Sequence, residues 1–219
     1  MYTIIDLFDL EHTAAKEYLS GFTYPWEALK GIKDLILRLG ETLGDEYREV
    51  SPQVWVHRSA SVAPTAYLGA PCIIGPETEV RHCAFIRGSA LVGAGCVVGN
   101  SVELKNVILF DSVETPHYNY VGDSILGYKA HMGAGSITSN IRADRKNIVV
   151  RMGGEAMETG LRKIGAMLGD HAEIGCNAVL NPGSVIGRNA QVYPLTGVRG
   201  TVPAGYICKQ NGEIGRAHV

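Results

Sequence analysis

Aliphatic residues recur at every sixth position along the middle of the chain. The position four residues after an anchor is usually small or compact, as at Ala60, Cys72 and Ala90. A period of six matches neither an α-helix nor an alternating β-strand. It predicts short strands joined by turns, three of which form one 18-residue coil of a parallel β-helix. The anchors are Val56, Val62, Leu68, Ile74, Val80, Ile86, Val92, Val98, Leu104 and Phe110.

Shorter runs continue the repeat as far as residue 198, with two interruptions. A slip of register is expected around residues 115–120, and a long polar segment follows Ile137. Solenoids accommodate insertions as loops on one face, and that face often carries function. The pattern therefore predicts an all-β chain with a parallel β-helix over residues 51–208 and a loop insertion at residues 138–163. The continuing anchors are Leu126, Met132, Leu168, Ile174, Leu180, Ile186, Val192 and Val198.

The first 50 residues follow a different pattern. Pro25 stands where a helix could begin, and apolar residues from Leu29 to Leu43 then recur at helical spacing. The open ends of a solenoid need cover, because unpaired strand edges invite aggregation. Residues 1–50 are therefore expected to form a helical N-terminal cap or an oligomer contact, and residues 209–219 a C-terminal tail.

Composition narrows the range of partners and compartments. The 20 Lys+Arg and 22 Asp+Glu residues give a net charge of −2, which argues against a nucleic-acid or membrane partner. The five cysteines form no C-x-x-C pair, so we expect neither a disulfide framework nor a thiolate zinc site. The N-terminus lacks the features of a signal peptide, and no apolar stretch is long enough to span a membrane. The expected location is the cytoplasm.

Two basic residues indicate a phosphate site. Arg87 and Lys105 each directly follow an anchor and are separated by one full coil, so they should stack on neighbouring coils. Two cations so close repel each other by roughly 1 kcal/mol in water, and a dianion between them would remove that cost. The alternative is a pair of solvated surface side chains.

His117, in the expected slip of register, is the candidate general base, because a neutral imidazole suits that role near pH 7. Glu103 is the candidate for orienting it, although it could equally be an exposed turn carboxylate. We expect Arg87, Lys105 and His117 to line one cleft at a boundary between subunits. The polar insertion suits a substrate-contacting loop, and backbone N–H groups near residues 133–135 could stabilise an oxyanion.

A zinc site of the kind found in hexapeptide carbonic anhydrases is disfavoured. His82 and His117 lie nearly two coils apart, but the position expected for a third histidine holds Gly122. We therefore expect no metal. Cys72 and Cys96 occupy the small inward position of the repeat and are interpreted as core residues.

The motifs of residues 86–150 resemble one family of enzymes. IRGSALVGAGCVVGNSVELKN, PHYNYVGDSILG, HMGAGSITSN and NIRADRK follow one another in the order found in the acetyltransferase half of bacterial glucosamine-1-phosphate acetyltransferase/N-acetylglucosamine-1-phosphate uridyltransferase. The chain is still more similar to the C-terminal half of archaeal sugar-1-phosphate nucleotidylyltransferases. The resemblance implies a left-handed β-helix, a homotrimer with active sites between subunits, and acetyl-CoA as co-substrate with no metal required.

By motif position, the resemblance also implies roles for single residues. Arg87 and Lys105 would hold the phosphate of an amino-sugar 1-phosphate, and His117 would be the base with Glu103 beside it. Tyr120, Asn140 and Lys146 would line the sugar site, where His131 replaces an asparagine of the bacterial enzymes. Ala134, Cys176 and Pro194 would contact acetyl-CoA. The expected reaction is N-acetylation of glucosamine-1-phosphate or galactosamine-1-phosphate.

Two alternatives stay open beside this interpretation. The sequence contains no Gly-rich nucleotide loop of the nucleotidylyltransferase half, so we expect no nucleotidyltransferase activity. The chain could instead be a non-catalytic trimeric partner of a separately encoded nucleotidyltransferase. It could also be a hexapeptide acyltransferase for another amino-sugar acceptor, such as a sugar carried by a nucleotide.

Overall fold

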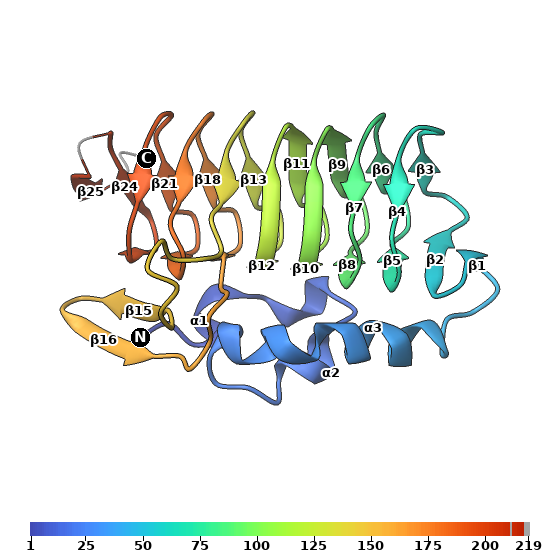
Figure 1. Cartoon of the computed structure of the whole chain (residues 1–219), viewed down its shortest axis with the longest axis horizontal. Helices are drawn as coiled ribbons and strands as arrows, with labels where there is room; N and C mark the ends of the chain where they lie inside the picture. Colours follow the sequence, from blue (N-terminus) through green and yellow to red (C-terminus); the bar gives the residue numbers. More distant parts are fainter. Residues whose placement is uncertain (211, 217–219) are drawn as a thin grey trace.

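A computed structural model describes residues 1–210 and 212–216 of the chain. It confirms the predicted parallel β-helix: short strands wind around a triangular prism whose long axis is horizontal in Figure 1. Strands separated by one coil lie side by side, as Val54 pairs with Cys72 and Cys72 with Ala90. The inward anchors form one continuous apolar core along the prism.

The prism has three walls, which we number in the order in which the chain enters them. The first wall contains β2 (Val54–His57), β5 (Cys72–Ile74), β8 (Ala90–Val92), the second halves of β10 (Glu103–Leu109) and β12 (Tyr120–Leu126), β17 (Ala166–Leu168), β20 (Ser184–Ile186) and β23 (Thr201–Val202). The second wall contains β3 (Ser61–Val62), β6 (Glu79–Val80), β9 (Val97–Asn100), β11 (Glu114–His117), β13 (His131–Met132), β18 (Glu173–Ile174), β21 (Gln191–Val192) and β24 (Tyr206–Cys208).

The third wall contains β4 (Tyr67–Leu68), β7 (Phe85–Ile86), the first halves of β10 and β12, β14 (Ile137–Thr138), β19 (Val179–Leu180) and β22 (Gly197–Val198). Because β10 and β12 run around the edge between the third and first walls, they join these two walls into one sheet. We call this edge of the prism the polar corner. It includes residues 87–89, 105–106 and 122–123, and the insertion also leaves the prism here.

The slip of register begins earlier than the sequence pattern predicts. Glu103 pairs with Phe85, a full coil before it, but Val107 pairs with Ala90 at a spacing that is shorter by a single residue. One residue is therefore missing from the turn at the polar corner, and the next coils keep the shorter spacing. As a result Leu109, not Phe110, lies level with Val92. Phe110 is still buried, and its ring centroid lies 5.1 Å from that of Phe8.

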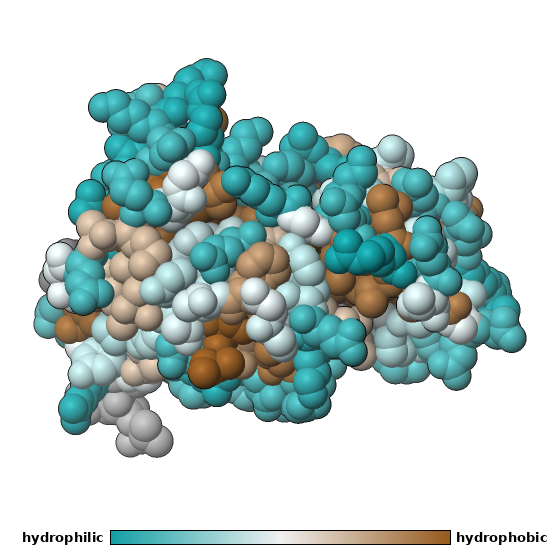
Figure 2. Space-filling view, turned by 90° about the horizontal axis from the view of Figure 1, so that it is seen from below, coloured by the Kyte–Doolittle hydropathy of each residue, from teal (hydrophilic) through white to brown (hydrophobic). Residues whose placement is uncertain are grey.

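The N-terminal segment lies along the side of the prism rather than over an open end (Figure 1). It contains α1 (Ile4–Leu7), η1 (Leu10–His12), α2 (Lys16–Leu19), η2 (Pro25–Gly31) and α3 (Ile32–Gly40). It covers the outward side of the first wall, with α3 packed against β5, β8 and β10. Its own outer surface is mostly hydrophilic or neutral, with separate small apolar patches, in Figure 2.

The first wall needs this cover because it is apolar on both sides. In its three-residue strands the outer two residues point into the core and the middle one points away from it. The middle residues align from coil to coil and are each at most 3% exposed. They are Ile73, Leu91, Ile108, Ile125, Met167 and Val185. The N-terminal segment thus covers the side of the prism, and burial of this outward apolar stripe favours its packing there.

Antiparallel strands protect the two ends of the solenoid. β1 (Tyr47–Ser51) pairs with β2 at the first coil, and β25 (Ile214–Arg216) pairs with β24 at the last. Each added strand satisfies part of an otherwise open edge. Part of the expected C-terminal tail is therefore a strand; residues 211 and 217–219 of that tail lie outside the described residues.

The insertion is partly ordered by its own hairpin. β15 (Val149–Met152) and β16 (Glu155–Glu158) pair antiparallel. Ile148 and Val150 are fully buried, and the Thr201 hydroxyl donates to the Arg151 carbonyl at 2.7 Å. These contacts fix the insertion against the last coils, so it is more than a solvated loop. No helix in the described part of the chain is long and apolar enough to cross a bilayer.

Candidate functional site

A column of polar side chains runs along the polar corner. The residue that directly follows each third-wall strand occupies an equivalent place on its coil, because the strands before it are in register. From coil to coil these residues are Gly69, Arg87, Lys105, Gly122, Ser139, Asn181 and Arg199. The predicted stacking of Arg87 and Lys105 is thus confirmed by the register, and Arg199 lies on the same column.

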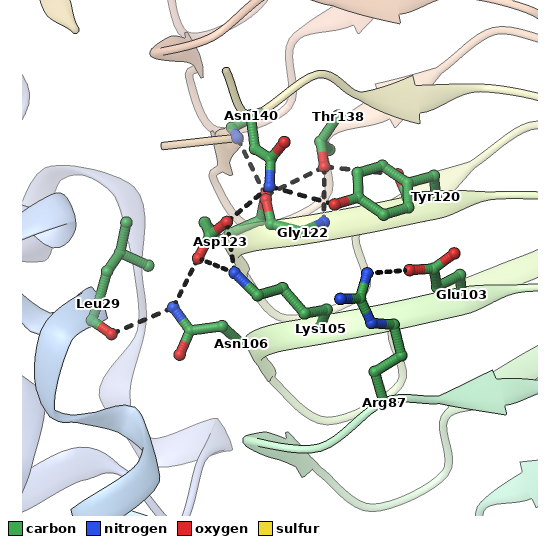
Figure 3. A network of polar contacts seen from close by, with 12 residues as sticks. Leu29, Arg87, Glu103, Lys105, Asn106, Tyr120, Gly122, Asp123, Thr138 and Asn140 are labelled. Atoms are coloured by element: carbon green, nitrogen blue, oxygen red, sulfur yellow. Dashed lines mark hydrogen bonds and ion pairs between the residues drawn. The ribbon is translucent and has the colours of Figure 1, made fainter. Parts of the chain in front are cut away.

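Asp123 organises the centre of this corner (Figure 3). Its carboxylate accepts hydrogen bonds from Lys105 Nζ at 2.9 Å, Asn106 Nδ2 at 2.9 Å and Asn140 Nδ2 at 2.6 Å. The side chain of Asp123 is only 6% exposed, so the carboxylate depends on these donors in place of water. It therefore fixes the positions of two predicted substrate-binding residues, Lys105 and Asn140.

The backbone explains how Asp123 and Asn106 reach this position. Both have positive φ values, 50° and 55°, and form the turn at the polar corner on adjacent coils. Asn and Asp accept this left-handed conformation more readily than most other residues. The turn places both side chains on the same corner, where Asn106 Nδ2 also donates to the Leu29 carbonyl at 3.2 Å. The N-terminal segment is thereby connected to the site.

Arg87 has a carboxylate partner of its own. Its Nη1 lies 2.7 Å from Glu103 Oε1, and both side chains are partly exposed. This carboxylate raises the pKa of Arg87 above its usual value. The argument that the two stacked cations need an external dianion is therefore weakened, because Glu103 and Asp123 each neutralise one of them. Glu103 contacts Arg87 and not His117 in this structure.

Tyr120 and Asn140 lie together beside Asp123. Asn140 Nδ2 donates to the Tyr120 hydroxyl at 3.1 Å as well as to Asp123. Burial, followed by the nearby Asp123 and Glu103 carboxylates, raises the pKa of Tyr120. The structure therefore brings together Arg87, Lys105, Tyr120 and Asn140 of the predicted substrate residues, with the phenol in its neutral form.

His117 lies on a different wall from the two cations. It ends β11 on the second wall, next to the edge at which the chain turns into the third wall. Its side chain is exposed, and its backbone N–H donates to Asn119 Oδ1 at 3.1 Å. Within one chain, Arg87, Lys105 and His117 therefore do not line one cleft, so that expectation is not met by the single chain.

The residues predicted to contact acetyl-CoA lie along the edge between the second and third walls, which we call the groove corner. A shallow groove of about 230 Å³ there is lined by residues that include His131, Gly133, Cys176 and Pro194. His131 Nδ1 lies 3.0 Å from Glu173 Oε2 on the next coil. The groove thus combines a predicted substrate residue with two predicted cofactor residues, and it lies on the same edge of the prism as His117.

Most backbone N–H groups near Gly133 and Gly135 already donate hydrogen bonds within the prism. The Gly133 N–H donates to Ile174 O at 2.7 Å, and the Gly135 N–H donates to His117 O at 3.0 Å. Ala134 lies between them, and within the described part of the chain its N–H has no hydrogen-bond acceptor. Of the N–H groups expected to meet an oxyanion, that of Ala134 is therefore the available one.

Lys146 is a predicted substrate residue that lies in the insertion. Its side chain is exposed in the insertion, and its backbone N–H donates to Asp144 Oδ1 at 3.2 Å. Within residues 1–210 and 212–216, no hydrogen bond joins its ammonium group to Tyr120 or Asn140. Among these same residues there is no group of three or more His, Cys, Asp or Glu side chains that could hold a metal ion.

The sequence interpretation missed Asp123 and Asn106, although a signal for one was present. Asp123 follows Lys105 at the same spacing that separates Lys105 from Arg87 and that singled out those two cations. That spacing draws attention to Asp123 but does not place it, because in the shortened coil Gly122, not Asp123, lies level with Lys105. Asn106 carries no such signal, because its contact with Asp123 depends on the same shortened coil.

The fold and site define the chain as a hexapeptide-repeat β-helix with a charged corner and a second, groove-bearing corner. A family model described as the GMPPB C-terminal domain matches residues 70–152. The bifunctional sugar-1-phosphate nucleotidylyltransferase/acetyltransferase of Sulfurisphaera tokodaii is 36% identical over 91 residues, which are 42% of this chain and 23% of that protein. The bifunctional protein GlmU of Methanococcus maripaludis is 37% identical over 89 residues, covering 41% and 21% of the two chains.

These matches confirm the resemblance to the sugar-1-phosphate nucleotidylyltransferase/acetyltransferases. The alignments cover less than a quarter of the relatives' length. Among solved structures, the acetyltransferase domain of PglB from Neisseria gonorrhoeae in complex with acetyl coenzyme A covers 74% of this chain and 56% of its own, with a TM-score of 0.36 and 16% identity. That structural similarity is too distant to bear on function.

Proposed function

We propose that this protein transfers the acetyl group of acetyl-CoA to the amino group of an amino-sugar 1-phosphate, glucosamine-1-phosphate or galactosamine-1-phosphate. The observation that carries the proposal is the polar corner, where Lys105, Tyr120 and Asn140 converge around Asp123. The segment similarity to proteins named as acetyltransferases supports the same reaction. No nucleotidyl transfer is proposed for this chain, and a separately encoded nucleotidyltransferase would supply that step.

In the proposed complex the sugar phosphate competes with Glu103 for Arg87. That ion pair is partly exposed and screened by water, so a dianionic phosphate can displace the carboxylate at little cost. Lys105 stays on Asp123 and presents its remaining N–H donors to the phosphate. Asn140 and Tyr120 then face the sugar ring, and Lys146 closes over it from the insertion.

His117 is the proposed general base. The amino sugar is mostly an ammonium ion and must lose a proton before its nitrogen can attack the thioester carbonyl. The His117 imidazole accepts a proton from the attacking nitrogen, the C–N bond forms, and the Ala134 N–H donates to the oxyanion. Collapse of this intermediate breaks the C–S bond, and the departing CoA thiolate takes the proton that His117 had accepted, which restores the neutral imidazole. One such donor can contribute about 3 kcal/mol to transition-state stabilisation.

Because His117 and Lys105 lie on different edges of one prism, the proposed active site is shared by two chains. The polar corner of one subunit would face the groove corner of its neighbour, and a closed ring of such contacts gives the proposed homotrimer. Cys176 and Pro194 of the groove would then hold acetyl-CoA beside the sugar bound at the neighbouring polar corner. The cytoplasmic location stays a prediction.

A screen of acceptors tests the proposed reaction. The protein is incubated with acetyl-CoA and each of glucosamine-1-phosphate, galactosamine-1-phosphate and an amino sugar carried by a nucleotide. Loss of thioester absorbance is followed, because the exposed Cys83 and Cys176 would react with a thiol reagent. Turnover with either sugar 1-phosphate supports the proposal. Turnover with the nucleotide-linked sugar alone favours another acceptor, and none with any acceptor favours a non-catalytic partner.

Replacing the proposed base separates chemistry from binding. His117→Ala is expected to lower kcat by about 10²–10⁴ with little change in KM, because general-base catalysis is lost while the phosphate contacts stay. Steady-state kinetics with saturating acetyl-CoA measures both constants. His82→Ala, which removes another exposed histidine of the second-wall side, is the matched control. An unchanged kcat in His117→Ala would remove this residue from the mechanism.

A further inference from the structure

A groove lies farther along the polar corner, beyond Asn140. It has a volume of about 540 Å³ and lies between the insertion and the last coils. Three arginines line it: Arg142, Arg151 and Arg199. Ser139 and Ile141, the neighbours of Asn140 in the chain, line it as well, so the groove is continuous with the proposed sugar site.

The positive charge of this groove is only partly neutralised. Arg142 binds Asp144 through two contacts of 2.8 and 2.7 Å, and Glu158 also acts on it electrostatically. Arg151 and Arg199 are exposed, and in residues 1–210 and 212–216 neither side chain has a hydrogen bond or an ion pair. Two guanidinium groups are therefore available to an anion at this end of the corner.

The fold brings these two arginines to the same place. Arg199 follows β22 on the polar column, and Gly200 and Thr201 come directly after it. The Thr201 hydroxyl donates to the Arg151 carbonyl, which attaches the insertion beside this turn. Arg199 is four coils from Lys105, or about 19 Å at the strand spacing of about 4.8 Å. A second anion bound here would be well separated from a sugar phosphate at Lys105.

We propose that Arg151 and Arg199 form a second anion site, which binds the diphosphate of a nucleotide. One guanidinium group can donate two parallel hydrogen bonds to two oxygens of a phosphate. A diphosphate has enough oxygens to accept such bonds from both arginines. The inference rests on the proposed function for its ligand, since CoA and a nucleotide-linked amino sugar both carry a diphosphate. The separation from Lys105 favours CoA, whose long arm places its diphosphate far from the thioester.

Calorimetric titration tests this site with two probes, CoA and UDP, at low ionic strength. The proteins are the wild type, Arg151→Gln, Arg199→Gln, the double variant and the control Arg38→Gln. Arg38 is an exposed arginine of α3, so its replacement changes the net charge by the same amount as each single variant. Because all replaced side chains are exposed, thermal melting should show unchanged folding.

The double variant is expected to bind CoA at least about tenfold more weakly than the wild type, because it loses charge-assisted hydrogen bonds to phosphate. Arg38→Gln should bind as the wild type does, and the salt dependence of binding should be smaller in the double variant. Weakened binding of UDP with unchanged binding of CoA would assign the site to an acceptor nucleotide. Affinities for both probes within twofold of the control would overturn the proposal, as would a wild type that binds neither.

The titration and the acetyl-transfer assay can fail separately. A chain that releases no CoA from acetyl-CoA but binds CoA through Arg151 and Arg199 retains the anion site and refutes the proposed reaction. If the double variant acetylates an amino-sugar phosphate with the wild-type KM for acetyl-CoA and also binds UDP as the wild type does, the reaction stands and the anion site is refuted.

Discussion

At the scale of single residues, the most consequential side chain is a buried carboxylate. Asp123 accepts from Lys105, Asn106 and Asn140 and takes a backbone conformation that most residues avoid. A carboxylate that is nearly out of water persists only when donors surround it. The polar corner is therefore a preorganised unit, in which each donor is held by the same acceptor and is already oriented before a ligand arrives.

Removing that acceptor should both destabilise the fold and impair the site. Asp123→Ala leaves Lys105, Asn106 and Asn140 without their common partner, so the free energy of unfolding should fall by about 1–3 kcal/mol. Urea unfolding measures this change. Asp144→Ala, which removes an exposed carboxylate paired with Arg142, should change it much less, because water screens that ion pair. Equal effects of the two substitutions would contradict the central role of Asp123.

Residue types and spacing could predict part of this site. The stacking of Arg87 on Lys105 follows from the length of the coil, and the register confirms it. The counter-charges could not be predicted, because Glu103 reaches Arg87 from a position two residues before Lys105 and Asn106 reaches Asp123 across a shortened coil. Side-chain partners on neighbouring coils depend on single-residue changes of register that the six-residue pattern does not resolve.

At the scale of elements, the N-terminal segment and the first wall form one structural unit. The middle residues of the first-wall strands are as buried as the inward anchors, since the helices cover them. The sequence does carry this signal: the first-wall strands CII, ALV, VIL and AML are apolar at all three positions. Strands with one exposed side would alternate apolar and polar residues.

A matched pair of substitutions tests the lateral cover. Ile125 lies in the outward stripe of the first wall and is fully buried, whereas Ile5 of α1 is 75% exposed. Ile125→Ala should lower the free energy of unfolding by about 2–5 kcal/mol, as expected when a packed side chain leaves a cavity. Ile5→Ala should change it by less than about 1 kcal/mol. Denaturant unfolding of both variants measures the difference, and similar small effects would show that the segment does not pack on this wall.

A second contact between segment and solenoid depends on pH. Asp170 accepts from the Asp9 N–H at 2.7 Å and the Tyr128 N–H at 2.8 Å, and Arg188 lies 3.4 Å away. Burial raises the pKa of Asp170 above the ordinary 3.8 in spite of these contacts. The folded state therefore holds a proton on Asp170 more readily than the unfolded chain does. This contribution to stability is present at low pH and is lost as the pH rises through the folded pKa.

Relative to Asp170→Asn, the wild type should therefore gain stability as the pH is lowered from about 7 to about 4, through the usual carboxylate range. Urea unfolding of both proteins at each pH gives the difference between their free energies of unfolding. Comparing the two proteins cancels the contributions of carboxylates with a lowered pKa, such as that of Asp6. A wild type that instead loses stability relative to the variant over this range would show that ionised Asp170 is favoured by folding.

At the scale of the whole molecule, the walls differ in what they leave exposed. The N-terminal segment covers the first wall, and the second and third walls carry outward side chains that are exposed, such as Gln191 on the second wall and Phe85 on the third. The polar corner and the groove corner border the third wall on its two sides. Both proposed halves of the active site are thus accessible to neighbouring chains, and subunit contacts have two uncovered walls available.

Mixed oligomers test whether two chains share each site. Lys105→Ala removes a residue of the polar corner, and His117→Ala removes one near the groove corner, so each variant alone should have little activity. Co-expression of the two should restore activity well above that of either parent, because some sites then combine an intact corner from each chain. Activity is measured on mixed oligomers purified through two different tags. The same residual activity in the mixture as in the parents would indicate that one chain supplies both residues.

The sequence by itself determined the coil. A six-residue period of aliphatic anchors leaves only a narrow apolar core as the place to bury them, which specifies parallel strands, walls and corners. Only the tertiary structure decided where the N-terminal segment lies, which carboxylate holds which cation, and that His117 and Lys105 occupy different edges of one chain. Local periodicity reports which residues are buried, whereas these arrangements depend on packing between segments far apart in the chain.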